Sequence, residues 1–198
     1  MSISLRALSL MVFSLCCGCG SSPNTTYYAL AAVSGTARQA SLGAIEVRRP
    51  GIAGYLDRTE ILAQWDGQRL QLANNAGWAE PIAAMIGRVL ADDLSERLPG
   101  TIVFSAGSDL SMPTTTVVEL LIRKFDYGSD GHVHLLALWS VRGGGQPSAR
   151  AASLRARPTT DETGAIVAAM SGLLGQLADE IASELQARGA APISRAPE

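Results

Sequence analysis

The position of the cysteines constrains this chain more than any other feature. All three, Cys16, Cys17 and Cys19, lie at its beginning. The remaining chain of about 180 residues therefore contains no thiol for a disulfide, a nucleophile or a metal-binding thiolate. That length is enough for one domain with a sizeable hydrophobic core. We expect packing alone to stabilise this domain.

The residues before Cys19 are typical of the start of an exported protein. Arg6 is followed by an apolar run over residues 8–15 and then by small residues that include Gly18. A cysteine directly after a small residue at the end of such a run resembles the bacterial lipobox, in which the preceding peptide is removed and the cysteine carries lipids. We therefore predict a signal peptide over residues 1–18 and lipid attachment at Cys19.

The lipobox pattern has one departure, because Cys16 and Cys17 stand where a leucine and a small residue are usual. A plain secretory signal and an uncleaved anchor are the alternatives, and the anchor is the weaker one because about 20 apolar residues are needed to cross a bilayer. No later apolar run is expected to approach that length. Residues 19–24 are a short polar tether. Gly20, in place of an aspartate after the cysteine, favours sorting to the outer membrane.

Charge and histidine content exclude two classes of function. The chain has Lys+Arg 16 against Asp+Glu 18, so no basic surplus indicates nucleic-acid binding. His132 and His134 would share one face of a strand, but a metal site needs further ligands, and the chain has no other histidine and no later cysteine. We expect solvated histidines and no metal.

The sequence also lacks a recognisable catalytic motif. Gly143-Gly144-Gly145 is not followed by the Lys and Ser/Thr of a phosphate-binding loop, and it is typical of a hairpin tip. We expect the carboxylates that might pair to lie on solvated faces or beside turns: Asp57, Asp66, Asp92 and Asp93. The prediction is a non-enzymatic domain without a cofactor.

The front of the domain is rich in predicted strands. They cover residues 25–30, 42–47, 59–65 and 69–73. Asp66-Gly67 lies between the last two and suits a tight hairpin turn. Four later strands are predicted over residues 101–104, 114–127, 132–142 and 149–157. The last three should form an antiparallel meander, and the apolar face of residues 132–142 must pack against another layer.

Two amphipathic helices are predicted. Pro81 opens the first, and Pro99-Gly100 ends it. Its polar face should carry Arg88, Asp92, Asp93 and Glu96, and Glu80 should complement the helix dipole at the entrance. The second helix covers about residues 160–188, where Thr159 and Glu162 have the spacing of a capping box. Its apolar stripe favours a core-packing helix over a partner-binding coiled coil.

Two motifs are not explained by packing alone: Tyr55-Leu56-Asp57-Arg58 before a strand, and Trp78-Ala79-Glu80-Pro81 before a helix. With the lipobox and the closing helix, they make this chain similar to the PqiC-like family, the ABC-type transport auxiliary lipoproteins. Thr59, where that family often has proline, is a small departure.

The resemblance implies a three-layer α/β domain over residues 25–188, with a mixed, largely antiparallel sheet covered by two main helices, and a frayed tail over 189–198. It also implies an outer-membrane lipoprotein that faces the periplasm and docks an MCE-type lipid-transport system, with an MCE-domain protein and an inner-membrane transporter component as partners. The candidate contacts are Tyr55, Leu56, Asp57, Arg58, Trp78, Glu80 and Pro81.

Alternatives remain for the role of the two motifs and for the function of the protein. Trp78 could staple the helix entrance, and Arg58 could pair with Asp57 or Glu60, in which case the motifs are structural. The protein could instead be an envelope-assembly lipoprotein that chaperones or plugs an outer-membrane β-barrel, or a hydrolase whose site has no recognisable motif. A docking subunit for a ring-shaped MCE tube would suit a homo-oligomeric ring.

Overall fold

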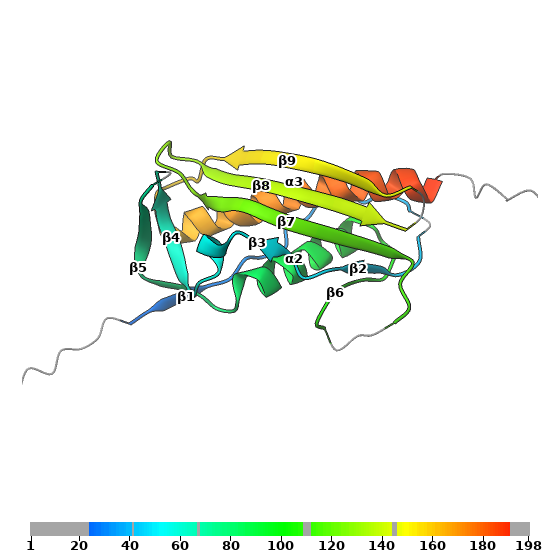
Figure 1. Cartoon of the computed structure of the whole chain (residues 1–198), viewed down its shortest axis with the longest axis horizontal. Coiled ribbons are helices and arrows are strands. Elements are labelled where there is room, and N and C mark those ends of the chain that lie inside the picture. The colour runs from blue at the N-terminus through cyan, green and yellow to red at the C-terminus, as the bar shows by residue number, and fades with distance from the viewer. Residues whose placement is uncertain (1–23, 41, 67, 109–111, 144–145, 191–198) are drawn as a thin grey trace, which may run out of the picture.

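The computed structural model describes residues 24–190 except 41, 67, 109–111 and 144–145. The predicted signal peptide, Cys19 and most of the predicted tether lie outside the described residues, as do residues 191–198. Figure 1 shows an elongated body in which long strands run beside two helices.

The larger sheet has six strands in the order β6-β2-β7-β8-β9, with β3 paired to β7. The strands are β2 (Ile45–Val47), β3 (Gly51–Ile52), β6 (Val103–Ser105), β7 (Thr116–Tyr127), β8 (Val133–Arg142) and β9 (Ser148–Ala156). The predicted antiparallel meander is confirmed in β7, β8 and β9. The short strands β2, β3 and β6 pair in parallel, which makes the sheet mixed.

The smaller sheet has the order β1-β5-β4. Its strands are β1 (Thr26–Tyr28), β4 (Glu60–Trp65) and β5 (Leu70–Trp78). The predicted hairpin of β4 and β5 is confirmed, and Oδ1 of Asp66 accepts the N–H groups of Gln68 and Arg69 at 3.0 and 2.7 Å. Strand β5 runs further than predicted and reaches Trp78. This extension brings the second motif onto the smaller sheet.

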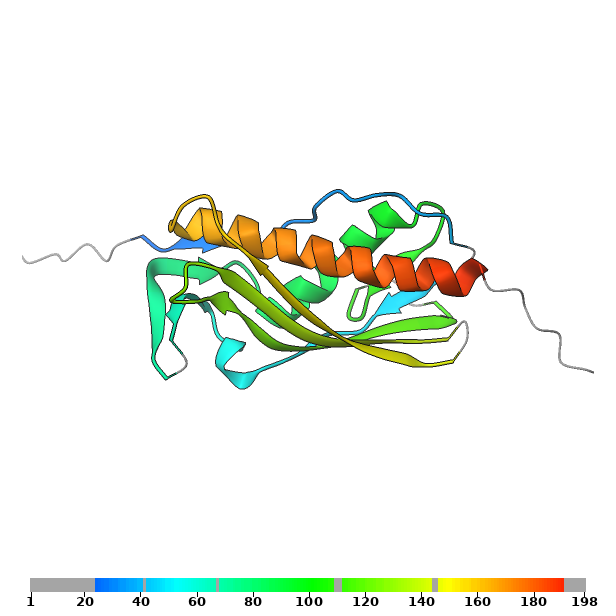
Figure 2. The same cartoon turned by 90° about the horizontal axis from the view of Figure 1, so that it is seen from above.

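Both helices, α2 (Ile82–Arg97) and α3 (Thr163–Ala190), lie on the same face of the larger sheet, as Figure 2 shows. The inward residues of β8 alternate with outward ones and are buried: Val133, Leu135, Ala137, Trp139 and Val141. The apolar stripe of α3 covers them, so the prediction of a core-packing helix is confirmed. By length and composition alone, α3 is also apolar enough to cross a membrane, and the expectation that no later segment approaches that length was wrong.

The helix starts differ in how well the sequence predicted them. Helix α2 begins after Pro81, whose carbonyl accepts the N–H groups of Ala84 and Met85 at 3.0 and 3.1 Å. Helix α3 begins at Thr163, so the capping box predicted at Thr159 is wrong. The hydroxyl of Thr160 instead accepts the N–H of Glu162 at 3.4 Å.

An extended segment, residues 29–40, crosses the outer side of the two helices (Figure 2). We call it the strap. Its Val33 donates its N–H to Oδ1 of Asp93 at 2.7 Å and accepts a bond from Nη1 of Arg97 at 2.8 Å. Asp93 is fully buried, so its predicted place on a solvated helix face is wrong. Sheet, helices and strap are stacked in that order, and the predicted α/β class with a mixed sheet and two helices is confirmed.

Candidate binding groove

The two sequence motifs meet in space. Tyr55 and Leu56 lie in a single 3₁₀ turn (Gly54–Leu56), and Trp78 is the last residue of β5. The N–H of Trp78 donates to the carbonyl of Thr59 at 2.7 Å, which joins the end of the first motif to the start of the second. Between them lies a groove of about 400 Å³, which we call the motif groove. It is lined by Asp57, Arg58, Thr59, Trp78, Ala79, Glu80 and Pro81.

Tyr55 and Leu56 position the first motif and do not line the motif groove. Leu56 is buried in the core. The hydroxyl of Tyr55 donates to Oδ2 of Asp126 on β7 at 2.6 Å. Burial, aided by this hydrogen bond, raises the pKa of Tyr55 well above its ordinary value. The phenol therefore stays a neutral donor, and it fixes the turn to the larger sheet.

Arg58 follows that turn and is only partly exposed. Its Nε donates to the carbonyl of Tyr55 at 2.7 Å. Within the described part of the chain its guanidinium forms no ion pair, so the alternative in which it pairs with Asp57 or Glu60 is not what the structure contains. The motif groove is thus lined by an arginine whose terminal nitrogens are not engaged by a carboxylate.

Trp78, the first residue of the second motif, supplies an apolar wall of the motif groove. Its side chain is 6% exposed and belongs to the hydrophobic core, and the backbone of the next residue, Ala79, donates to the carbonyl of Tyr28 at 2.9 Å. Trp78 therefore holds the entrance of α2 on the core, which is the structural role considered above. Its position in the wall of the motif groove is compatible with a second role at the surface.

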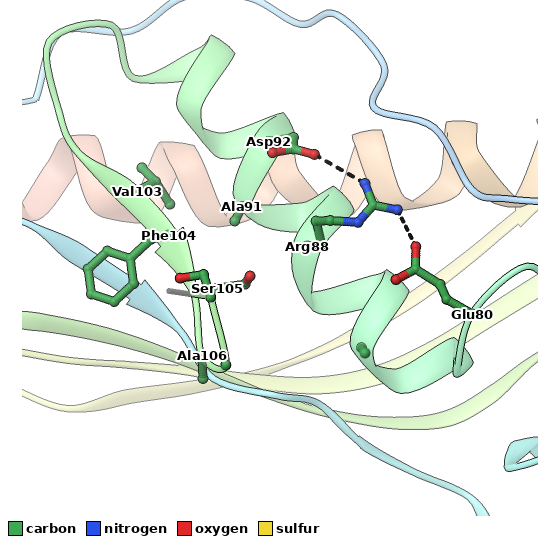
Figure 3. Close-up of a pocket in the computed structure, with 11 residues that line it drawn as sticks. Glu80, Arg88, Ala91, Asp92, Val103, Phe104, Ser105 and Ala106 are labelled. Atoms are coloured by element: carbon green, nitrogen blue, oxygen red, sulfur yellow. Dashed lines mark hydrogen bonds and ion pairs between the residues drawn. The ribbon is translucent and has the colours of Figure 1, made fainter. Parts of the chain in front are cut away.

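Glu80 separates the motif groove from a second cavity of about 460 Å³ between α2 and β6. In Figure 3 Arg88 lies between Glu80 and Asp92. Its Nη2 is 2.5 Å from Oε1 of Glu80, and its Nη1 is 3.5 Å from Oδ2 of Asp92. Glu80 therefore lies at the helix entrance, as predicted, and its charge is largely neutralised by Arg88.

A small cavity of about 10 Å³ lies under the motif groove, with Arg58, Trp78 and Asp126 among its lining residues. Asp126 is fully buried, and its Oδ1 has no hydrogen-bond partner among the described residues, although Nζ of Lys124 is 3.6 Å away. Nothing in the sequence singled out Asp126, because it lies far along the chain from the motif that it supports.

The two histidines share an aspartate. Nε2 of His134 is 3.0 Å from each carboxylate oxygen of Asp130, and Nδ1 of His132 is 2.9 Å from the carbonyl of the same residue. The hydrogen bond from His134 lowers the pKa of Asp130. The described residues contain no group of three or more His, Cys, Asp or Glu side chains that could hold a metal ion.

The fold and the site define a mixed α/β domain with a surface groove that is built from two separated motifs. The chain belongs to the family of ABC-type transport auxiliary lipoprotein components, whose family model matches residues 28–182. This is a family of transport auxiliary lipoproteins and not a family of enzymes. A lipoprotein family implies association with a membrane, as the signal sequence predicted, while Cys19 itself stays a prediction.

Curated relatives support this assignment, and solved structures share the fold. The chain is 30% identical over 173 residues to the intermembrane transport lipoprotein PqiC of Escherichia coli K12, which covers 85% of this chain and 91% of that protein. The Shigella flexneri protein of the same name matches equally well. Protein XCC0632 from Xanthomonas campestris has the same fold, with a TM-score of 0.67 at 17% identity over 83% of this chain and 97% of that one. An uncharacterised protein also gives 0.67, at 23% identity over 82% and 99% of the two chains.

Proposed function

We propose that this protein is an outer-membrane lipoprotein subunit of an MCE-type intermembrane lipid-transport system, and that it acts there as a docking component. Its partners would be an MCE-domain protein that bridges the periplasm and the inner-membrane transporter component. The observation that carries the proposal is the motif groove: two motifs about twenty residues apart build one surface, and it includes Arg58, which forms no ion pair with the described residues. Family membership supports the transport context.

The anchor in this proposal is the lipid on Cys19. Acylation there would hold the domain on the periplasmic face of the outer membrane, with residues 20–24 as a short spacer. A Cys19→Ser variant that is still exported should be folded but soluble in the periplasm. Fractionation and the circular dichroism spectrum of the released protein test this. Full transport function in the unlipidated variant would argue against the anchor.

Docking is tested with the tagged, lipidated full-length protein in detergent extracts. We expect the MCE-domain protein to co-purify, and recovery of a β-barrel in its place would favour the envelope-assembly alternative. A docking subunit that meets a ring-shaped tube should itself form a symmetric ring, and native mass spectrometry of the purified lipoprotein measures its copy number. Recovery of neither an MCE-domain protein nor a transporter component would overturn the proposal.

A further inference from the structure

We propose that Arg58 is the receptor for an acidic side chain of a protein partner, so that the motif groove binds an acidic, partly apolar peptide segment. This inference rests on the proposed docking function and assigns its chemistry to one residue. Three observations carry it: the lack of an ionic partner for Arg58 among the described residues, the contacts that hold this side chain in place, and the shape of the surrounding groove.

The missing partner is unusual within this molecule. Among the described residues, the other arginines that are not fully exposed each have a carboxylate. Arg38 and Arg97 pair with Asp179 at 3.3 and 2.9 Å, and Arg188 pairs with Glu184 at 3.0 Å. Arg58 is also partly sheltered from solvent, yet in the part of the chain that the structure describes its one hydrogen-bond partner is the carbonyl of Tyr55. A sheltered charge gains most from a counter-ion, so this site is completed by an anion from outside the chain.

The position of Arg58 is fixed before any ligand arrives. Its Nε is engaged by the carbonyl of Tyr55, and the hydroxyl of Tyr55 is engaged by the buried carboxylate of Asp126. The terminal nitrogens of the guanidinium are the donors that remain. Two parallel N–H groups match the two oxygens of a carboxylate, and a pre-positioned arginine loses little freedom when it binds one. Asp126 and Tyr55 are positioning residues in this arrangement.

The groove favours a side chain over a lipid. It holds about 400 Å³, and the cavity beneath it holds only about 10 Å³ because Leu56, Trp78 and other core residues close it. An acyl chain would find no buried channel beside Arg58, whereas an acidic side chain with an apolar neighbour fits against Trp78 and Pro81. Glu80 is already neutralised by Arg88, so among the residues that line the groove the exposed carboxylate of Asp57 is the main charge that opposes an anion.

The test places a photo-crosslinking amino acid at Ala79 of the lipidated full-length protein in cells. Ala79 is exposed, lines the groove and uses only its backbone for its bond to Tyr28, so the change leaves the fold intact. We expect a crosslink to a protein segment that contains Asp or Glu. Arg58→Gln should lower the crosslink yield at least about tenfold, Arg58→Lys less, and the exposed control Arg123→Gln not at all.

The decisive step is a charge exchange. Arg58→Glu combined with the mapped acidic residue changed to Lys should restore the crosslink that either change alone removes. A crosslink to lipid only, a protein crosslink that Arg58→Gln leaves unchanged, or no crosslink would each overturn this inference. Co-purification of the MCE-domain protein with Arg58→Gln at wild-type yield would also overturn it, while leaving the proposed docking function standing.

Discussion

Two arginines in this molecule, Arg97 and Arg58, show what a sheltered guanidinium requires. Arg97 is 1% exposed, and its nitrogens bond to the carbonyls of Val33 and Gly175 and to the carboxylate of Asp179. It also lies 3.6 Å from Asp93. Within the described ranges Arg58 has one hydrogen bond, to the carbonyl of Tyr55. The first arginine is satisfied by its own chain, and the second presents unused donors at a groove.

The difference separates a structural site from a binding site. Arg97 fastens the strap to α2 and α3, and Arg38 of the strap in turn donates its N–H to the carbonyl of Arg97 at 2.7 Å. The strap follows the predicted tether and β1 in the chain, so this cluster holds the N-terminal part of the domain on the core. The groove around Arg58 fastens no such segment. A charge without a partner is therefore the more informative signal of function here.

The largest expected effect comes from removing Arg97. With Val33, Asp93 and Asp179 it forms what we call the Arg97 cluster. Arg97→Met keeps much of the side-chain volume but leaves Asp93 buried without its cation, which should lower the free energy of unfolding by about 3–5 kcal/mol. The control is Arg88→Met on the same helix, where the ion pairs are exposed and should contribute less than about 1 kcal/mol. Urea unfolding of the two variants measures this. Equal losses would contradict the structural role of Arg97.

The sequence predicted the long elements of this fold well and the strap poorly. Strands β7, β8 and β9 and both helices were predictable because their apolar residues repeat with the period of a strand or a helix. Asp93 was misplaced because α2 is covered on two sides, by the sheet and by α3 with the strap. A helix packed in this way has buried positions that amphipathic periodicity assigns to solvent.

The motif groove was predictable in its residues but not in its chemistry. The two motifs stand out in the sequence, yet the hydrogen bond from Tyr55 to Asp126 and the pairing of Glu80 with Arg88 depend on tertiary placement. The lack of a carboxylate partner for Arg58 among the described residues depends on tertiary placement as well. Asp57 and Glu60 are close to Arg58 in sequence, and only the structure shows that neither reaches it.

The second effect is a pH dependence within the Arg97 cluster. Burial raises the pKa of Asp93 from 3.8 to about 6, against the opposing influence of the Val33 N–H and Arg97. The folded state holds the proton of the Asp93 carboxyl more tightly than the unfolded state does. The stabilising contribution of Asp93 to the free energy of unfolding is therefore full below about pH 4 and is lost as the pH rises through 6. The lost stability amounts to about 2–3 kcal/mol.

Asp93→Asn isolates that contribution, because asparagine can still accept the N–H of Val33. Asp179 and Glu184 have lowered pKa values, so their stabilising contributions are lost as the pH falls. The stability of the wild-type protein therefore depends on pH through contributions of opposite sign. The difference in unfolding free energy between Asp93→Asn and the wild type should grow in favour of the variant between pH 4 and 7.5. A constant difference across that range would show that Asp93 does not titrate there.

A smaller effect is expected from Tyr55→Phe. The change removes the donor to Oδ2 of Asp126, a carboxylate whose Oδ1 already has no hydrogen bond among the described residues. We expect a loss of about 1–2 kcal/mol in thermal or urea unfolding. The control Tyr27→Phe removes an exposed hydroxyl and should change little. Tyr55→Phe should also weaken the crosslink at Ala79, since the turn that holds Arg58 would lose its attachment to β7.

The smallest effect on stability is expected at Arg58 itself. Arg58→Gln removes one hydrogen bond to a backbone carbonyl and no ion pair, so the free energy of unfolding should change by less than about 1 kcal/mol. Removal of a sheltered, uncompensated charge could even offset that loss. The same substitution is the one expected to abolish capture of the partner. Measured together, unfolding and crosslinking separate the two arginines completely: Arg97→Met should lose stability, whereas Arg58→Gln should lose binding at nearly unchanged stability. A loss near that of Arg97→Met would mean that Arg58 is a structural residue whose partners form within the fold.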